Sequence, residues 1–424
     1  MSHFGLICPE LSGHLNPMTT LGRELKRRGH RVTLIGRPDA QKKTESVDLE
    51  FGMVGEKEFP AGSLAATTAQ LGRLGGLSAI RFTAELLRRA AVTILDEAAG
   101  VIASAGIDAL LVDQVTPAGE TVAEILDLPF VSVCNALALN HDPALPPPVT
   151  PWRYRRGTIW RWRNALGDSI LRMAARSIIR ETNERRARHG LLPQMAGRTP
   201  DGVGLAQIAQ QPAFFDYPRE RLPENFHYTG PWHALESGEK SKFPWEKLDG
   251  RPLIYASMGT LQNRQTPIFQ MIAAACRGLD AQLVLSLGSH DQRLDAKLAG
   301  AAIVVPFAPQ LELLRRAALT ITHAGLNTAL ESLAQGVPMV AIPITNDQPG
   351  VASRLEWLGV ARIVPPRRLT PQRLRASVRT VLGEPHYRAR ARQWKLTLAS
   401  IDGLRLAADI VERAVETRQS VLRT

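Results

Sequence analysis

Short β-rich apolar runs alternate with longer runs of helical periodicity through the first third of the chain. The strand candidates are Phe4 to Cys8, Val32 to Ile35, Ala109 to Val112 and Phe130 to Val133. One helix is predicted from about Pro17 to Arg28, with Asn16 as its N-cap and Gly29 as its stop. A second helix is predicted from about Ala118 to Leu126. This alternation is typical of a parallel sheet covered by helices.

A second series of strand candidates follows the polar stretch Gly230 to Pro252, which contains prolines and glycines. These candidates are Leu253 to Ser257, Leu283 to Ser286, Ala302 to Val305, Leu319 to Thr322 and Met339 to Ile342. From Thr370 to Val421 the chain is predicted to be helical throughout, with breaks near Gly383 to Pro385 and at Gly403. We therefore expect an α/β protein with domains at 1–232 and 252–395, a linker at 233–251 and C-terminal helices at 396–424 that pack back toward the first domain. Two open parallel sheets in succession place a ligand cleft between the domains, at the carboxyl ends of the strands.

The segment between these two series of strands is basic. Asn140 to Pro151 contains five prolines and is predicted to be an extended loop, and basic amphipathic helices are predicted to follow it to about Arg188. Pro151 to Gly190 holds eleven arginines and three acidic residues, which is a large share of the formal net charge of +12. Its first residues mix bases with aromatic rings: Trp152, Arg153, Tyr154, Arg155, Arg156, Trp160, Arg161, Trp162 and Arg163.

Two readings of this basic stretch stay open. Tryptophan and tyrosine favour the headgroup level of a membrane, and arginine attracts anionic lipid, so the stretch could rest on a bilayer surface. Alternatively it is a solvated basic helix face whose tryptophans pack in the core. We expect no nucleic-acid partner, because no nucleic-acid fold signature accompanies the charge.

The overall composition, 44% hydrophobic and 22% charged, is that of a globular protein. No apolar run reaches the roughly 18 residues of a spanning helix, so no transmembrane segment is predicted. The N-terminus lacks a signal-peptide pattern, and we expect a cytoplasmic protein, peripheral on the inner face of the membrane if the basic stretch binds lipid. Cys8, Cys134 and Cys276 have no metal-ligand spacing and are expected to be reduced core residues.

The segment Phe307 to Gln348 contains the groups that a UDP-sugar needs. Phe307 follows a strand and can stack on a base, while the backbone near Ala308 and the side chain of Gln310 can address the base and the ribose. His323 and Gly325 lie where a strand ends and a helix opens. A helix N-terminus offers free N–H groups and positive potential to a diphosphate without a cation.

Further candidate ligands lie after that helix start. Asn327 and Thr328 are in the first turn and can donate to phosphate oxygens, and Glu331 lies one turn deeper on the face of Asn327, within reach of ribose hydroxyls. Asp347 and Gln348, after the next strand, suit sugar hydroxyls. An earlier strand ends at the loop formed by Ser257, Gly259 and Thr260, where glycine lets the backbone approach a phosphate.

This segment resembles the signature box of the UDP-glycosyltransferase superfamily. The resemblance implies the GT-B fold, in which two Rossmann-like domains face each other across a cleft, with the acceptor bound by residues 1–232 and the UDP-sugar by residues 252–395. It implies donor binding by Phe307, Gln310, His323, Asn327, Thr328, Glu331, Asp347 and Gln348, and it places a phosphate-contacting loop at 257–260. In that family a final Gln tends to accompany a glucosyl donor. The alternative is that these are helix caps and helix-end residues, which explains any one of them alone but not all eight in register.

His14 lies between the first predicted strand and helix, at the cleft end of the sheet. A neutral imidazole near a helix N-terminus can serve as the base for an attacking hydroxyl, and a carboxylate can orient its ring. Asp113 closes a strand at the same sheet edge, whereas Asp108 precedes that strand and is expected at the opposite end. The resemblance places the family's base at His14 and its partner at Asp113. A loop histidine without chemistry and a carboxylate that caps the next helix are the alternatives.

Two absences bear on the reaction class. The chain contains no Asp-X-Asp motif, and its first loop is GHLNP instead of a dinucleotide-binding G-x-G-x-x-G. We therefore expect metal-free displacement with inversion, with no cofactor beyond the donor substrate.

Phrases outside the box narrow the resemblance. MSHF, LLVDQVTPAGETVAE, ALNHDPALPPPVTP and YPRERLPENFHYTG are similar to the bacterial zeaxanthin glucosyltransferases of carotenoid biosynthesis. This implies transfer of glucose from UDP-glucose to an apolar carotenoid diol. Three alternatives stay open: a transferase of the same fold for acceptors such as macrolides or flavonoids, a sugar-nucleotide epimerase, and a non-catalytic binder of UDP-sugar or lipid.

Overall fold

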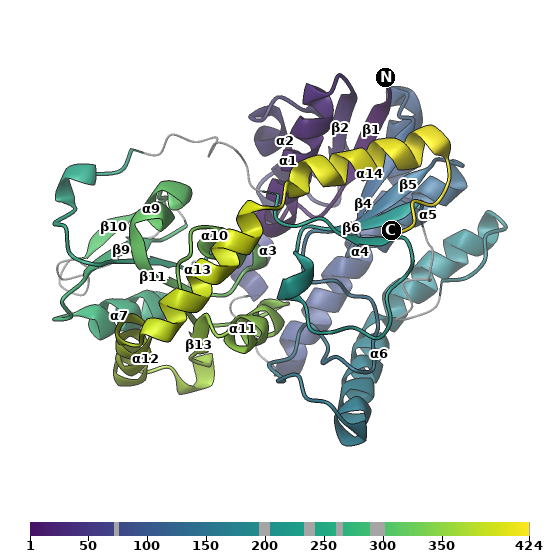
Figure 1. Cartoon of the computed structure of the whole chain (residues 1–424). Coiled ribbons are helices and arrows are strands. Elements are labelled where there is room, and N and C mark those ends of the chain that lie inside the picture. Colours follow the sequence, from purple (N-terminus) through teal and green to yellow (C-terminus); the bar gives the residue numbers. More distant parts are fainter. Residues whose placement is uncertain (72–75, 195–203, 233–241, 260–265, 289–301, 424) are drawn as a thin grey trace.

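The computed structural model describes residues 1–71, 76–194, 204–232, 242–259, 266–288 and 302–423, which contain two parallel sheets (Figure 1). The first sheet has the strand order β3-β2-β1-β4-β5-β6-β7, and every neighbouring pair is parallel. Its strands are β1 His3–Ile7, β2 Arg31–Gly36, β3 Glu50–Met53, β4 Ala109–Asp113, β5 Phe130–Cys134, β6 Ala206–Ala209 and β7 Phe226–Tyr228. The four strands predicted in this part of the chain are confirmed within one residue at each end.

The second sheet has the order β10-β9-β8-β11-β12-β13 and is also parallel. Its strands are β8 Leu253–Ser257, β9 Gln282–Ser286, β10 Ile303–Val305, β11 Ala317–Thr322, β12 Met339–Ala341 and β13 Ala361–Ile363. All five predicted strands are confirmed within two residues at each end, and β13 is an additional strand at the sheet edge. The predicted fold class, two Rossmann-like parallel sheets, is therefore confirmed.

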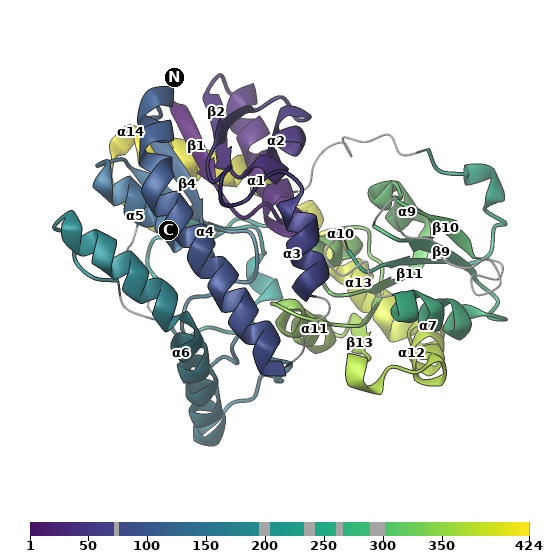
Figure 2. The ribbon, with the colours of Figure 1, turned by 180° about the vertical axis from the view of Figure 1, so that it is seen from behind.

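Helices cover both faces of the first sheet (Figures 1 and 2). The helices in this part of the chain are α1 Ser12–Arg27, α2 Pro38–Glu45, α3 Ser63–Leu71, α4 Gly76–Ala105, α5 Pro117–Ile125 and α6 Thr158–Arg188. The basic helices predicted to end near Arg188 are one helix, α6, which lies alongside α4.

The predicted start of the first helix is wrong. The helix begins at Ser12 after an extended Leu11, whose carbonyl accepts the N–H groups of His14 and Leu15. Asn16 is therefore inside the helix and is not its N-cap. Pro17 lies one turn in, where its missing N–H leaves a single carbonyl of the preceding turn without its helical partner.

The second domain has the helices α7 Thr266–Cys276, α9 Gln310–Arg316, α10 Leu326–Ala334, α11 Gln348–Trp357, α12 Pro371–Gly383 and α13 Pro385–Ala399, and the chain ends with α14 Gly403–Thr417. Single-turn 3₁₀ helices are η1 Ala213–Phe215, η2 Trp245–Lys247 and η3 Pro366–Arg368. The predicted breaks at 383–385 and 403 are present, but the last helix ends at Thr417 and not at Val421.

The C-terminal helices span both domains. In Figure 1, α13 lies along the second domain and α14 along the first, where Ala407, Ile410 and Val411 join the core formed by α1 and β1. Gly403 begins α14, where the chain passes from the second domain back to the first. It packs against Gly230 so closely that a Cβ on Gly403 would lie 2.5 Å from the Thr229 carbonyl oxygen. Of the predicted linker, residues 233–241 lie outside the described residues, and 242–251 include η2.

Two further findings concern the cysteines and the length and apolar character of the helices. Cys8, Cys134 and Cys276 are free and buried, as predicted. Among the helices that the structure describes, none combines the length and the apolar character that crossing a bilayer requires.

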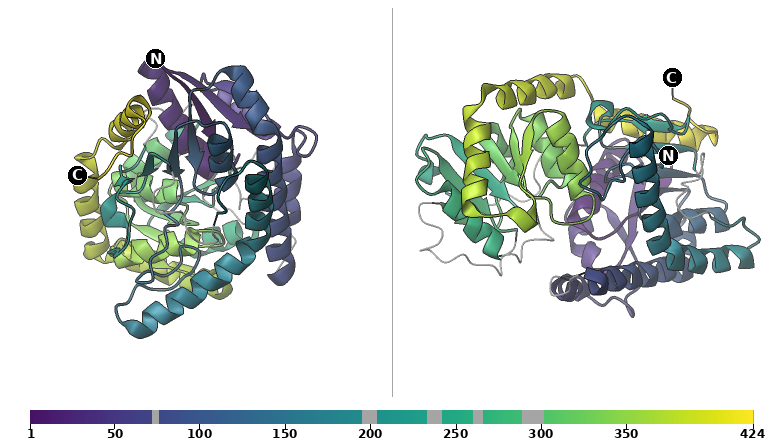
Figure 3. Two further views of the ribbon diagram at one scale, coloured as in Figure 1. Left: turned by 90° about the vertical axis from the view of Figure 1, so that its right-hand side faces the viewer. Right: turned by 90° about the horizontal axis from the view of Figure 1, so that it is seen from below.

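The strand order decides where side chains can meet. In the first sheet β1 and β4 are neighbours, and in the second β8 and β11 are neighbours, so in both sheets the helical crossovers diverge between these two strands. Ligands of open α/β sheets bind at such switch points, outside the carboxyl ends of the strands. Figure 3 shows the two sheets side by side, and hydrogen bonds between residues that follow their strands join the domains there.

Candidate active site

The first switch point brings His14 and Asp113 together. His14 lies in the first turn of α1, directly after β1, and Asp113 is the last residue of β4. The imidazole Nδ1 and the carboxylate Oδ2 are 2.7 Å apart. Asp113 is fully buried, and the His14 side chain is 16% exposed. Asp108 lies at the opposite end of β4, where it accepts the His3 N–H.

Environment decides the protonation of this pair. Burial lowers the pKa of His14, but the charge and the hydrogen bond of Asp113 outweigh burial and raise it above its ordinary value. Because Asp113 Oδ2 accepts, Nδ1 carries the proton and Nε2 is left as the basic nitrogen. The geometry is that of a histidine base with an orienting carboxylate.

Sequence reasoning missed a third member of this group, Asn135, which follows β5. Its Nδ2 donates to the same Asp113 Oδ2 at 2.7 Å, while Oδ1 of Asp113 accepts the Val115 N–H at 3.0 Å. Asp113 therefore does not cap α5, whose N-cap is Thr116. An amide directly after the neighbouring parallel strand was the available signal.

In the second domain, the ring of His323 lies between two glycines. A Cβ on Gly259 would be 2.7 Å from His323 Cε1, and a Cβ on Gly325 would be 2.5 Å from its Nε2. Burial lowers the pKa of His323 to about 4, so the imidazole is neutral at pH 7, although a hydrogen bond with the backbone of Ser257 opposes the shift. Its Nδ1 is buried and has no hydrogen-bond partner within the described residues. Thr260 lies outside the described residues.

Residues of β8, α9 and α10 form one hydrogen-bonded group. Gln310 Oε1 accepts from the Tyr255 hydroxyl at 2.9 Å, and Gln310 Nε2 contacts Thr328 and the Glu331 carboxylate. Burial raises the pKa of Glu331 to about 7, and the bond from Gln310 opposes the shift. The positions ahead of this group, Phe307 and Ala308, are half-buried.

Asn327 connects the two halves of the site. Its Oδ1 accepts from Gln210 Nε2 at 2.9 Å, and its Nδ2 donates to the carbonyl oxygen of Gly13 at 3.3 Å. That carbonyl is free because its helical partner would be the N–H of Pro17, which proline lacks. Pro17 thus leaves the carbonyl oxygen of Gly13, the neighbour of His14, available as an acceptor, and Asn327 of α10 donates to it.

Asp347 and Gln348 lie at the start of α11, facing the loop that follows β5. Asp347 Oδ2 is 3.4 Å from the Leu137 N–H, and burial raises the pKa of Asp347 while the charge of His14 opposes the shift. Gln348 is buried, and its Oε1 accepts the N–H groups of Ile344 and Thr345, which leaves its Nε2 for a ligand. Asp347 is close enough to His14 that the carboxylate also helps to raise the pKa of the imidazole.

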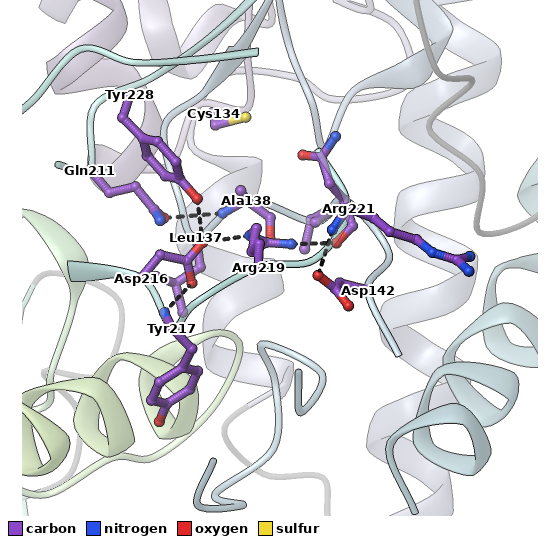
Figure 4. Close-up of polar contacts among 12 residues, drawn as sticks. Cys134, Leu137, Ala138, Asp142, Gln211, Asp216, Tyr217, Arg219, Arg221 and Tyr228 are labelled. Carbon is purple, nitrogen blue, oxygen red and sulfur yellow. Dashed lines mark hydrogen bonds and ion pairs between the residues drawn. The ribbon is translucent and has the colours of Figure 1, made fainter. Parts of the chain in front are cut away.

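A framework of hydrogen bonds made by buried polar side chains holds the loop that carries Leu137 (Figure 4). Arg219 donates to the carbonyl oxygens of Asn140 and Ala138 at 2.8 and 3.1 Å, and Gln211 Oε1 accepts the Ala138 N–H. Asp142 accepts the N–H groups of Glu220 and Arg221. This proline-rich loop is therefore fixed where it contacts the start of α11.

The same framework reaches the second domain through Asp216. Arg354 of α11 is 1% exposed, and its Nη2 lies 2.7 Å from Asp216 Oδ1, while Arg219 Nε lies 2.6 Å from Oδ2. Burial raises the pKa of Asp216, but the two guanidinium groups outweigh burial and hold the pKa well below its ordinary range. Nearby, a Cβ on Gly350 would overlap the Pro148 carbonyl oxygen. The start of α11, with Asp347 and Gln348, is thus fixed against the first domain.

The residues of the basic stretch divide into two groups. Trp152 and Tyr154 are half-buried, and Tyr154 stacks on Tyr217 with ring centroids 5.1 Å apart. Trp160 lies under the guanidinium groups of Arg155 and Arg163 at 4.8 Å. Trp162 is 74% exposed. The aromatic side chains of the stretch are thus partly packed on the protein and partly exposed. Arg153 pairs with Glu356 and Arg161 with Glu220, and Arg156 is exposed.

The chain is similar to known proteins in sequence and in fold. A family model described as "UDP-glucoronosyl and UDP-glucosyl transferase" matches residues 194–401. The zeaxanthin glucosyltransferases of Pantoea ananas and Pseudescherichia vulneris are each 34% identical to the chain. The first alignment covers 100% of this chain and 98% of the Pantoea protein. The second covers 99% of this chain and 100% of the Pseudescherichia protein. Among solved structures, the glycotransferase of kitacinnamycin superposes with a TM-score of 0.75 at 24% identity, covering 97% of this chain and 98% of that one, which supports the fold.

These relatives show that the chain belongs to the UDP-glucuronosyl and UDP-glucosyl transferase family, and that the enzyme is a glycosyltransferase with a nucleotide-sugar donor and a hydroxylated acceptor.

Proposed function

We propose that this enzyme transfers glucose from UDP-glucose to a hydroxyl group of zeaxanthin or a closely related carotenoid, with inversion at the anomeric carbon and without a metal ion. The observation that carries the proposal is the 2.7 Å contact between His14 and Asp113, across the cleft from the start of α10. A base at this place is what a hydroxyl acceptor needs and what a non-catalytic binder or an epimerase does not.

The proposed step is a single displacement. Nε2 of His14 takes the proton of the acceptor hydroxyl as its oxygen attacks C1 of the sugar. The bond between C1 and the UDP oxygen breaks, the electron pair leaves with UDP, and the new bond forms on the opposite face. Asp113 stabilises the imidazolium that results, and Asn135 holds the carboxylate in place.

The residues assigned to the UDP-sugar support a diphosphate leaving group that is held by uncharged hydrogen-bond donors. The N-terminus of α10 and the neutral His323, whose Nδ1 has no partner in the described chain, face developing charge on the phosphates. We assign the loop of Ser257 and Gly259, with Gly325 and Thr328, to the phosphates, and Phe307, Ala308, Gln310 and Glu331 to the uridine. Asp347 and the free Nε2 of Gln348 are assigned to the sugar hydroxyls.

The carotenoid acceptor is supported by the relatives. Two zeaxanthin glucosyltransferases align along nearly the whole chain, including the first domain. The residues assigned to the donor lie in the second domain, so donor binding does not explain the similarity of the first. An apolar diol also agrees with the proline-rich loop at 140–151, since prolines lack N–H groups that an apolar partner would leave unsatisfied.

The test is incubation of the enzyme with UDP-glucose and zeaxanthin, a flavonoid or no acceptor, with and without EDTA, followed by mass spectrometry and NMR of the new glycosidic bond. We expect a β-glucoside of zeaxanthin whose formation EDTA does not slow. His14→Ala should lower kcat by about 100-fold to 10,000-fold, the usual contribution of a general base, with UDP affinity unchanged. Transfer to the flavonoid alone contradicts the acceptor, loss of activity in EDTA contradicts the metal-free step, and full activity of His14→Ala contradicts the base.

A further inference from the structure

We propose that the outward face of α6 is a docking surface for an anionic lipid bilayer. The docking face is defined by five side chains: Ile159, Trp162, Leu166, Ile170 and Met173. Their exposed fractions are 72, 74, 63, 54 and 57%. The inference deepens the proposed function, because a carotenoid acceptor resides in a membrane, but it rests on the geometry of this helix.

The docking face is one continuous stripe. Its residues are spaced by three or four positions, which places them on one side of a helix. Single exposed apolar residues are normal on a protein surface, but a contiguous row of large ones marks an interaction site. Among them Trp162 is of the type that favours the level of lipid headgroups.

The opposite side of α6 is already occupied. Asn164 is buried and donates to the Pro143 carbonyl oxygen at 3.2 Å, and Asp168 pairs with His141 at 2.8 Å. A Cβ on Gly167 would lie 2.8 Å from the Trp152 ring. The helix is therefore fixed by the side that faces the protein, and the docking face points away from it.

Charge identifies the partner. Arg155, Arg156, Arg176 and Arg180 are exposed, and none forms an ion pair with another residue of the described chain. Apolar side chains that enter the headgroup region, flanked by unpaired arginines, complement a surface of anionic phospholipid. A second copy of this strongly basic chain would bring the same arginines together and be repelled.

The docking face is also connected to the acceptor side of the cleft. Figures 1 and 3 show α6 along the outer edge of the first domain. Its inner side contacts the loop at 140–151, and the same loop touches Gly350 of α11 through Pro148. The docking face and the start of α11 are thus connected through a single loop.

The experiment is flotation of the full-length protein with vesicles of phosphatidylcholine, alone or mixed with phosphatidylglycerol. We expect binding to the mixed vesicles that weakens with salt. Combining Trp162→Ser and Ile170→Ser should lower the affinity by about tenfold or more, since each apolar side chain adds to the partition free energy. Arg176→Glu with Arg180→Glu should lower it at least as much, because each base near an anionic surface contributes about fivefold.

Matched controls are available elsewhere on the surface. Leu192 and Leu396 are 82 and 74% exposed, and Leu192→Ser with Leu396→Ser should leave vesicle binding unchanged. Arg367→Glu with Arg388→Glu changes the net charge as much as the α6 pair does and should have a smaller effect.

Several outcomes would overturn the proposal: equal binding by the α6 variants and wild type, an equal loss in the controls, or a wild-type dimer that Trp162→Ser dissociates. Thermal unfolding at the wild-type temperature shows that the variants are folded. Binding is measured without UDP-glucose or carotenoid, so its failure leaves the proposed transfer reaction standing, and failure of the transfer reaction leaves vesicle binding standing.

Discussion

Asp113→Asn is the sharpest perturbation of the proposed base. In the structure, Oδ2 of Asp113 accepts from His14 Nδ1 and from Asn135 Nδ2, while Oδ1 accepts the Val115 N–H. An asparagine has only one acceptor oxygen. If that oxygen replaces Oδ2, its NH₂ group meets the Val115 N–H; if it replaces Oδ1, the NH₂ group meets both His14 and Asn135.

Either orientation carries a calculable cost. A buried donor facing another donor costs about 1–3 kcal/mol, so stability should fall by that amount. In the second orientation the amide donates to Nδ1 and forces the proton of His14 onto Nε2, which removes the basic nitrogen. We therefore expect kcat to fall by about 100-fold to 10,000-fold.

The pH profile separates this mechanism from a general loss of structure. The active form of His14 is neutral, so activity falls as pH drops through its pKa, which Asp113 holds above the ordinary value. Removing the charge lowers that pKa, and the acid limb of kcat/KM should move to lower pH while the plateau falls. Asp108→Asn, at the exposed opposite end of the same strand, is the control and should change neither. A variant at Asp113 that keeps wild-type kcat and the same acid limb would refute the reasoning.

Three further predictions concern residues around the site. Gly325→Ala places a Cβ 2.5 Å from Nε2 of His323 and should weaken UDP binding about tenfold by calorimetry, whereas Gly383→Ala, whose Cβ would meet nothing within 4 Å, should leave it unchanged; equal affinities would count against the packing argument. Arg354→Met removes one partner of a buried ion pair and should cost about 3–5 kcal/mol in urea unfolding, and a loss below about 1 kcal/mol would contradict it. Gln210→Ala removes a hydrogen bond to the side-chain amide at the start of α10 and should raise KM for the donor severalfold, about 1 kcal/mol, while an unchanged KM would show that the bond does not matter.

The amino-acid sequence by itself determined nine of the strands and the breaks between the C-terminal helices, but not β3, β6, β7 and β13. Buried parallel strands are short runs of β-branched and aliphatic residues, which local composition reports directly. His323, Gly325 and Asn327 were placed between a strand end and a helix start for the same reason, because such a junction is a local pattern.

The start of α1 could not be determined in this way. A proline preceded by asparagine is the ordinary signature of a helix start, yet the helix begins at Ser12 because the Leu11 carbonyl accepts the first helical N–H groups. The carbonyl freed by Pro17 is then used by Asn327, a residue 314 positions from Gly13. No local pattern reports such a contact.

Only the tertiary structure decided which polar groups share a partner. Asn135, Gln210 and the Asp216–Arg354 pair each connect elements that lie far apart in the chain, by 117 positions for Gln210 and Asn327 and by 138 for the ion pair. The same holds for α6, whose sequence left its aromatic residues equally suited to a core and to a surface. Burial depends on the direction in which a helix is rotated against its neighbours, and the contacts of Asn164, Gly167 and Asp168 set that rotation.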